Sequence, residues 1–303
     1  VGKVKNTGVE ISLSTVNVQT KDFYWSTTFS FAKNKNEILE LNGGKEDLVA
    51  NKWFIGQPID VIYDYEYAGV CTAEEARAYA TNDAIKTKFI EGEMKLKDQQ
   101  QPGEEGYGVI DENDLVVLGH ALPKWTGSVT SNMTYKNFDF SFSIYTKQGG
   151  MVESPFMAEF TNYKDRGRNK LKMDYYIPAG TPVLNADGSG YTLTTEAHMG
   201  AYPYPTNTAN NNYGGGIGWG TDKQTTYVGN SYVDNSFVKI KNITLGYTFP
   251  KSWMSKIGVD HLRLYVNVLN PFTFTSYKGF DPEWADAALN DGTGGPSSRT
   301  YQV

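Results

Sequence analysis

The sequence has one cysteine, no long apolar run and no excess of basic residues, and each of these features excludes a class of protein. Cys71 alone cannot build an internal disulfide framework. No stretch approaches the roughly 18 consecutive apolar residues that a transmembrane helix needs. Lys and Arg number 28 against 34 Asp and Glu and are scattered, so the net charge of -6 provides no basic footprint for nucleic acid. We therefore expect neither a helical membrane protein nor a nucleic-acid binder.

The start of the chain also lacks two expected features, an initiator Met and a signal peptide. The first residues are Val1-Gly2-Lys3, which we interpret as the start of a fragment rather than of a whole protein. We expect residues 1–303 to be one segment of a single domain.

Aromatic residues, in contrast, are abundant. They make up 14% of the chain, with Tyr 21, Phe 15 and Trp 6. Yet the mean hydropathy is -0.48, so the chain is polar on average. A membrane β-barrel combines these properties, because aromatic and apolar side chains cover its outer face while its inner face is polar. The composition is compatible with a barrel and does not prove one.

Alternation of apolar and polar residues is the main structural signal, and its period of two is that of a β-strand. In residues 22–35 the odd positions carry Phe23, Trp25, Phe29 and Phe31, while the even positions are mostly small and polar. The pattern predicts strands over residues 9–20, 22–35, 123–135, 137–148, 237–249 and 261–270, and a seventh beginning near 299–301. Runs of this length exceed ordinary globular strands and match the 9 to 11 residues or so that a tilted strand needs to cross a bilayer.

The connections between these strands alternate in length. Tight turns are predicted near Thr20-Lys21 and Lys136-Asn137, and residues 250–260 form a short link with room for one helical turn. The links 37–122 and 149–236 are far longer. Outer-membrane barrels have short periplasmic turns and long extracellular loops. The sequence therefore predicts an all-β protein with about seven antiparallel strands of a transmembrane barrel and two long extracellular loops.

Two local features refine this prediction. The apolar positions of residues 237–249 change parity around Asn242, which indicates a β-bulge. In the first long loop, residues 72–82 (TAEEARAYATN) start with a capping Thr72 and carry Glu74 and Glu75 in the first turn. This stretch predicts a short surface helix.

Several motifs of the sequence resemble those of one family, and they occur along the chain in the same order as in that family. They are Asn6 to Glu10 with Phe23-Tyr24-Trp25 and Phe29 to Asn36, Trp53 to Pro58, Ile110 to Asp114, His261 to Tyr265, and Phe280 to Glu283. The most specific is Ser236 to Tyr247 (SFVKIKNITLGY). On these motifs the whole chain resembles the C-terminal barrel portion of SusC/RagA TonB-dependent transporters.

The resemblance implies import of a nutrient, a glycan or an oligopeptide, across the outer membrane of a Gram-negative bacterium. It implies a 22-stranded barrel, a plug domain and TonB box absent from this chain, and energy supplied through TonB. It also implies a SusD-like surface lipoprotein as a lid, contact with outer-membrane lipid, and dimers of barrel-lid pairs. No cofactor and no enzymatic activity are expected.

Candidate ligand or lid contacts are aromatic residues of the long loops, because exposed aromatic rings stack on sugars and on partner side chains. They are Trp53, Tyr63, Tyr65, Tyr202, Tyr204, Tyr213 and Trp219. Packing of the loops against themselves is the alternative use of these rings. A second aromatic group lies near the predicted short turns, where interfacial girdle residues are expected. It comprises Trp25, Tyr135, Phe138, Tyr247 and Trp253.

An acidic loop at residues 98–114 raises the question of a calcium site, because carboxylates at alternate positions bind Ca²⁺. In many relatives this loop carries closely spaced Asp and Asn, but here QQQPGEEGY fills residues 99–107. Asp111, Glu112 and Asp114 remain as candidate ligands. A solvated acidic turn is the alternative interpretation.

Catalytic motifs are not legible. His120, His198 and His261 are far apart, and the glycine-rich run 213–220 lacks the Lys-Ser/Thr of a P-loop. Asp281 and Glu283 lie close in sequence, which does not establish two carboxylates across a cleft. The alternative to a transporter is a soluble, aromatic-rich β-sandwich that binds carbohydrate. Such a fold needs shorter strands with turns every 8 to 12 residues or so.

Overall fold

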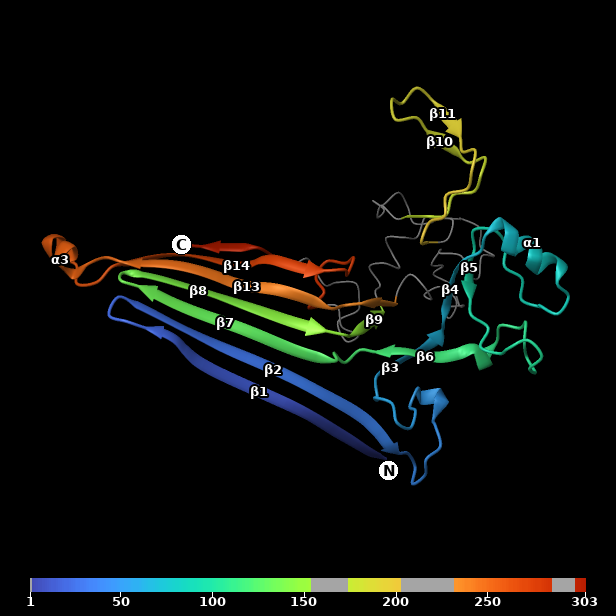
Figure 1. The fold of residues 1–303 in the computed structure, drawn as a ribbon, viewed down its shortest axis with the longest axis horizontal. Helices are drawn as coiled ribbons and strands as arrows, with labels where there is room; N and C mark the ends of the chain where they lie inside the picture. The colour runs from blue at the N-terminus through green and yellow to red at the C-terminus, as the bar shows by residue number, and fades with distance from the viewer. Residues whose placement is uncertain (1, 154–173, 203–231, 285–297) are drawn as a thin grey trace. The chain divides into compact units, whose positions relative to one another are not determined.

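The structure is a computed structural model that describes residues 2–153, 174–202, 232–284 and 298–303 (Figure 1). The chain divides into two compact units. The sheet unit comprises residues 1–61, 120–152 and 234–303, and the loop unit comprises residues 62–119 and 153–233. Among the described residues, no helix has the length and apolar character needed to cross a membrane.

The sheet unit contains one seven-stranded sheet with the order β1-β2-β7-β8-β13-β14-β15, and all neighbouring strands are antiparallel (Figure 1). The strands are β1 (Lys3–Gln19), β2 (Phe23–Glu40), β7 (Trp125–Tyr135), β8 (Phe138–Gln148), β13 (Phe237–Thr248), β14 (Arg263–Thr275) and β15 (Thr300–Gln302). The predicted seven antiparallel strands are therefore confirmed.

The strand boundaries correct the prediction at three ends. β1 starts at Lys3, β2 runs to Glu40 and β14 runs to Thr275, so these strands are 17, 18 and 13 residues long. The residues added to β1 and β2 alternate poorly in the sequence, whereas those added to β14 alternate only after Pro271. They become strand because the neighbouring strand supplies the partners for their backbone groups. Strand length is thus set by pairing as well as by side-chain pattern.

The short connections match the prediction. β1 and β2 join through residues 20–22, and β7 and β8 join through Lys136 and Asn137. Lys136 has φ 53, a left-handed conformation that such a two-residue turn requires. Between β13 and β14 the chain forms α3 (Lys251–Met254) and a 3-10 turn (Ser255–Ile257). The predicted single helical turn is therefore present.

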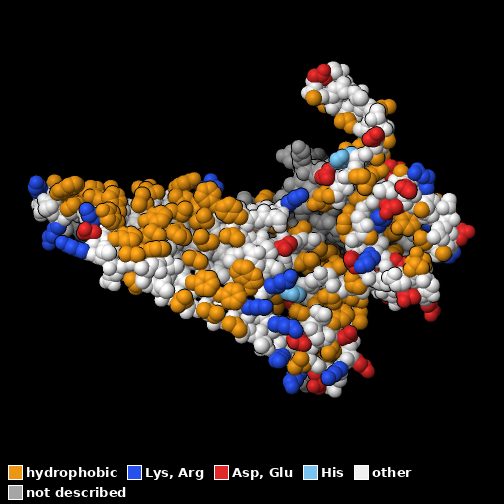
Figure 2. Space-filling model, viewed as in Figure 1, with side chains coloured by type: hydrophobic (Ala, Val, Ile, Leu, Met, Phe, Trp, Pro, Cys, Tyr) orange, Lys and Arg blue, Asp and Glu red, His pale blue; other side chains and the backbone are white. Residues whose placement is uncertain are grey.

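Register shows that the sheet has two chemically different faces. A cross-strand row of partners on one face reads Leu13, Phe29, Val129, Ile144, Ile240 and Phe272. We call this side the apolar face. It is not a core, because Leu13 is 55% exposed and Phe272 is 51% exposed. Figure 2 shows hydrophobic side chains gathered along the strands of this unit.

The adjacent row, one residue away on each strand, faces the other way. It reads Ser12, Ser30, Ser128, Tyr145, Lys239 and Thr273. We call this side the polar face. Because successive strand residues point to opposite sides, a period of two in the sequence becomes a separation of the two chemistries in space.

The predicted bulge in β13 is confirmed. The register shifts between Ile240 and Asn242 against both neighbouring strands. One extra residue at this point reverses the parity of the strand. Both Ile240 and Leu245 consequently lie in apolar rows although their numbers differ in parity, and the apolar face continues through the bulge.

The loop unit has a buried core of its own. Cys71, Phe89, Met94 and Leu96 form its centre and are each less than 5% exposed. Helix α1 (Ala73–Thr81) covers this core with Ala76 and Tyr79. The predicted cap is confirmed, since Thr72 and Glu75 form a reciprocal capping box. Burial raises the pKa of the Cys71 thiol to about 11, so this cysteine is an inert core residue.

The long connections contain short strands that the sequence pattern does not predict. Two-stranded sheets pair β3 (Val61–Tyr65) with β6 (Leu115–His120), β4 (Tyr67–Val70) with β5 (Met94–Leu96), β10 (Pro182–Leu184) with β11 (Tyr191–Leu193), and β9 (Met151–Glu153) with β12 (Tyr232–Asp234). Two further 3-10 turns cover Val49–Asn51 and Glu112–Asp114. The strands have only three to six residues, too few for a period-two pattern to be recognised in the sequence.

Candidate functional site on the polar face of the sheet

The polar face is lined by hydroxyl and amide side chains that bond across the strands. Thr130 Oγ1 donates to Ser143 Oγ at 3.2 Å, and Thr244 Oγ1 donates to the Asn267 amide oxygen at 2.9 Å. Asn267 in turn donates to Gln302 on β15 at 2.9 Å. These short side chains satisfy one another, which leaves a hydrophilic wall with little protruding bulk.

Four charged residues on this face form a network that we call the charge cluster: Lys239, Lys241, Asp281 and Glu283. Lys239 Nζ lies 2.7 Å from Asp281 Oδ2 and 2.8 Å from Glu283 Oε2. Lys241 Nζ lies 2.7 Å from Glu283 Oε1. The lysines come from β13 and the carboxylates from the turn after β14, so the cluster fastens that turn onto the sheet.

Burial makes the charge cluster unusual for a polar wall. The side chains of Lys239 and Asp281 are each 1% exposed. Burial raises the pKa of the Glu283 carboxyl, but the hydrogen bonds and charges of Lys239 and Lys241 outweigh it, so the pKa is lowered overall. Two positive and two negative groups balance, and this balance is what permits charges to remain away from water.

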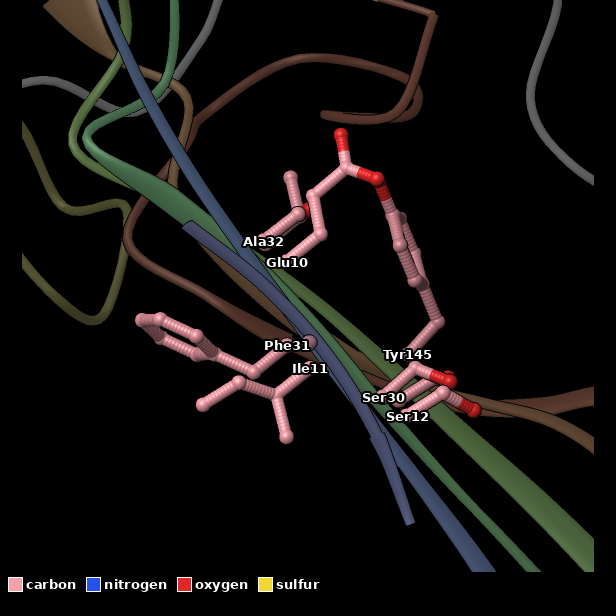
Figure 3. Close-up of a pocket in the computed structure, with 10 residues that line it drawn as sticks. Glu10, Ile11, Ser12, Ser30, Phe31, Ala32 and Tyr145 are labelled. Carbon is pink, nitrogen blue, oxygen red and sulfur yellow. The ribbon is translucent and has the colours of Figure 1, made fainter. Parts of the chain in front are cut away.

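A hollow of about 380 Å³ lies on the same face, beside the charge cluster in the register. Its lining comes from four strands: Glu10, Ile11, Ser12, Ser30, Phe31, Ala32, Thr126, Gly127, Ser128 and Tyr145. In Figure 3, Glu10, Ser12, Ser30 and Tyr145 project to one side of the strands, while Ile11 and Phe31 project to the other. The hollow therefore offers one carboxylate, one aromatic ring and several hydroxyls.

Asp139 and Arg263 form a clasp across β13. Arg263 Nε lies 3.0 Å from Asp139 Oδ1, and a second contact of 2.5 Å joins Nη2 to Oδ2. Asp139 on β8 pairs with Gly246 of β13, whereas Arg263 on β14 pairs with Thr248, so the Arg263 side chain reaches over Gly246 to meet Asp139. A Cβ on Gly246 would lie 2.5 Å from both side chains, so the clasp needs glycine at this position.

The predicted interfacial aromatics cluster at the turn end of the sheet. Phe23, Tyr135, Phe138 and Tyr247 are partners in one cross-strand row on the apolar face. The Phe138 and Tyr247 ring centroids are 4.7 Å apart. Trp25 follows one step further along β2 and donates its Nε1–H to Ser131 Oγ at 2.8 Å, while Trp253 lies on α3 and is 56% exposed. Their placement at a membrane interface remains a prediction.

The predicted loop aromatics occupy different surroundings. Trp53 is 38% exposed and follows the 3-10 turn at Val49–Asn51, in the sheet unit. Tyr63 and Tyr65 lie half-buried in β3, and Tyr65 packs against the core of the loop unit. Tyr202 lies edge-on to Tyr175 with ring centroids 6.4 Å apart. Tyr204, Tyr213 and Trp219 lie outside the described residues. Ligand or lid contact by this group stays a prediction.

The acidic loop uses its carboxylates on its own backbone. Asp114 accepts from the N–H groups of Gln99 and Asp111, at 2.7 and 2.8 Å. Asp111 accepts from Asn113, and a capping box of Asp111 and Asp114 flanks Glu112. Among the described residues, no group of three or more His, Cys, Asp or Glu is arranged to hold a metal ion. These contacts are those of the acidic turn, and Ca²⁺ binding remains untested.

Sequence reasoning missed the charge cluster and the hollow. Lys239 and Lys241 were read as part of a family motif, and Asp281 and Glu283 were set aside as a catalytic pair. One signal was available, because two lysines at alternate positions of a strand share one face. Glu10 and Tyr145 gave no such signal, because the strand register that brings them to one hollow cannot be deduced from the sequence of either strand.

No protein-family model matches the chain. TonB-dependent receptor P3 of Formosa agariphila is 30% identical over 93% of this chain and 25% of its own length. TonB-dependent receptor SusC of Bacteroides thetaiotaomicron is 27% identical over 93% of this chain and 24% of its own. The chain thus spans about a quarter of the length of these relatives.

Among solved structures, that of the RagAB peptide transporter superposes with a TM-score of 0.62, covering 99% of this chain and 29% of that one at 21% identity. The 'closed-closed' state of the RagAB peptide importer gives a TM-score of 0.61. At this identity the similarity shows the fold alone. The single sheet of long strands with two chemically different faces argues against the β-sandwich alternative. Fold, motifs and relatives together identify the chain as part of a SusC/RagA-like TonB-dependent receptor.

Proposed function

We propose that this chain is part of the wall of an outer-membrane importer for a nutrient, either a glycan or an oligopeptide. The observation that carries the proposal is the pair of adjacent rows on the sheet. One row presents apolar side chains of which none is buried, with Leu13 55% and Phe272 51% exposed, and the adjacent row presents hydroxyl groups and the compensated charge of Lys239. A wall of this kind fits between lipid on one side and a polar interior on the other.

Features at the two ends of the seven-stranded sheet support the same proposal. At the turn end, a row of four aromatics lies where the membrane interface is expected. At the other end, the chain leaves the sheet into the folded loop unit, which we propose is extracellular. Such a unit would shape the ligand chamber and dock a SusD-like surface lipoprotein.

We propose that TonB supplies the energy for import, through the parts of the receptor that lie outside the quarter spanned by this chain. The two sequence relatives are TonB-dependent receptors, and the similar solved structure is that of a peptide transporter. Dimers of barrel-lid pairs are part of the same proposal, as is the position of this segment at the C-terminal end of the barrel.

The test uses the full-length receptor in its native host. Outer membranes are extracted with mild detergent and the receptor is purified, with mass spectrometry of every co-purifying protein. We expect a surface lipoprotein in stoichiometric amount. Recovery of the receptor in the detergent-free soluble fraction would refute the barrel, and recovery from the membrane alone would refute the lid.

Uptake separates the energy source from binding. Labelled oligosaccharides and oligopeptides are offered to wild-type cells, to receptor-deletion cells and to cells without TonB. We expect one cargo class to accumulate in wild-type cells and to remain surface-bound without TonB. Equal accumulation in the TonB-deficient cells would exclude energised import.

A further inference from the structure

We propose that the hollow on the polar face binds a primary alkylammonium group, the head group of a lysine side chain or of an amino sugar in the cargo. This inference rests on the proposed import function and assigns a chemical class to one place on the wall. The hollow lies on strands β1, β2, β7 and β8, all within the sheet unit.

The hollow arises from small residues in two neighbouring cross-strand rows. The first row contributes Ser12, Ser30 and Ser128, and the second contributes Ala32 and Thr126. Larger side chains bound it on two sides, Glu10 from the edge strand and Tyr145 from β8. Figure 3 shows the carboxylate of Glu10 and the ring of Tyr145 reaching toward the same space.

The lining is suited to a cation with an apolar stem. Glu10 carries the only charge among the lining residues, and a carboxylate forms charge-assisted hydrogen bonds with an ammonium donor. An aromatic ring such as that of Tyr145 attracts a cation over its face. Serine and threonine hydroxyls accept the remaining ammonium hydrogens, while their methylene and methyl groups contact the stem.

Two neighbouring lysines bear on where in the hollow a cation binds. Lys239 is the direct partner of Tyr145 on β13, but Asp281 and Glu283 neutralise it within the charge cluster. Lys147 is the direct partner of Thr126, a lining residue, and stands at the opposite end of that row from Glu10. Three strand spacings of about 4.8 Å put Glu10 and Lys147 roughly 14 Å apart, so the charge of Lys147 opposes a cation at the β8 side of the hollow and favours one at the Glu10 side.

The size of the hollow limits what it recognises. Its volume of about 380 Å³ is at the small end of ligand sites and accommodates a head group rather than a whole oligomer. A wall subsite of this kind would hold one group of a longer cargo and release it readily, so weak binding is expected.

The experiment measures equilibrium binding to the purified full-length receptor in detergent, by saturation-transfer NMR titration. The probes are Nα-acetyl-lysine amide and its neutral counterpart, Nα,Nε-diacetyl-lysine amide, and glucosamine with N-acetylglucosamine. We expect a charged probe to bind and its acetylated partner to bind about tenfold more weakly or not at all. The probe pair that shows this difference identifies the source of the ammonium group.

Two variants locate the binding. Glu10→Gln keeps the shape and removes the charge, and should weaken the charged probe about tenfold. Glu37→Gln is the matched control, because Glu37 lies on β2, accepts from Lys35 and does not line the hollow. Tyr145→Phe keeps the ring and the affinity, whereas Tyr145→Leu should weaken binding about threefold.

The proposal is overturned if charged and acetylated probes bind equally, if no probe binds, or if Glu10→Gln and Glu37→Gln behave alike. None of these results bears on outer-membrane extraction with a lipoprotein, so failure of the subsite is distinguishable from failure of the import function.

Discussion

The sheet unit and the loop unit keep their apolar residues in opposite places. In the loop unit, Cys71, Phe89 and Met94 are withdrawn from the surface beneath helix α1, as in a water-soluble domain. In the sheet unit, Leu13, Leu245 and Leu264 point outward and are each more than half exposed. The two units thus keep their apolar residues in different surroundings, and the proposed function assigns lipid to the apolar face of the sheet unit.

The two units also differ in how they hold charged side chains. The loop unit leaves its ion pairs partly open to water, as with Lys97 and Glu66, whose side chains are 50% and 42% exposed. The sheet unit buries the side chains of Lys239 and Asp281 on its polar face, where each is 1% exposed. Substitutions in each unit measure what these differences contribute to stability.

Removing Lys239 should have the largest effect. Lys239→Ala leaves Asp281 buried without its cation, and we expect a loss of about 3–5 kcal/mol in unfolding free energy. Denaturant unfolding of the full-length receptor in detergent measures it. Lys241→Ala is the control, because Lys241 is 37% exposed and its removal should cost about 1 kcal/mol or less. Equal losses would show that the cluster is no tighter than an ordinary surface pair.

A cation introduced on the apolar face should have the second-largest effect on stability. Leu13→Arg places a charge in the row that we assign to lipid, at a cost of about 2–4 kcal/mol at mid-bilayer depth. Outer-membrane abundance and heat-modifiable gel mobility report the effect. Ser14→Arg on the same strand points to the polar face and should be tolerated far better. If both variants assemble equally, the apolar face does not contact lipid.

The loop unit should respond like a soluble domain. Thr72→Ala removes the cap of α1 and should cost about 1 kcal/mol, which corresponds to roughly fivefold more frequent opening. Cys71 is adjacent and buried, so its alkylation rate in the full-length receptor reports that opening. Thr81→Ala, at the other end of the helix, serves as the matched control and should change the rate little. An unchanged rate in Thr72→Ala would mean that the cap does not hold the core closed.

A pH effect on the turn after β14 should be the smallest. The pKa of Glu283 is lowered in the folded protein, so its contribution is complete above the ordinary glutamate pKa and is lost as pH falls through the folded value. We expect the turn to loosen in acid below about pH 4 and not between pH 5 and 8. Fluorine NMR of fluorotryptophan at Trp284 measures this, assigned with Trp284→Phe. Loosening near neutral pH would contradict the assigned cause.

The fold of the sheet unit could be predicted because period two is both local and strong. Phe138 to Ile144 alternates without exception, and even the bulge at Asn242 is visible as a change of parity. The ends of β1 and β14 were less accessible, because the polar start at Lys3 and the residues after Asn270 depend on their partner strands. The loop unit's short strands are below the length at which alternation can be recognised.

The candidate site was much harder to predict. Its floor combines Ser12, Ser30 and Ser128, three unremarkable serines that share a row only because of the strand register. Burial of Lys239 depends on a turn that returns to the sheet more than forty residues later in the chain. Sequence gives the residue types on each face, whereas the site depends on which strands are neighbours.

The clasp between Asp139 and Arg263 has a mechanical consequence. It joins β8 and β14, which are not neighbours, so sliding of either of these strands relative to the other stretches the ion pair. Three strands thereby share any shear load near the turn end. The position that makes this possible contributes no side chain at all, and a single added methyl group at Gly246 would separate the load-bearing partners.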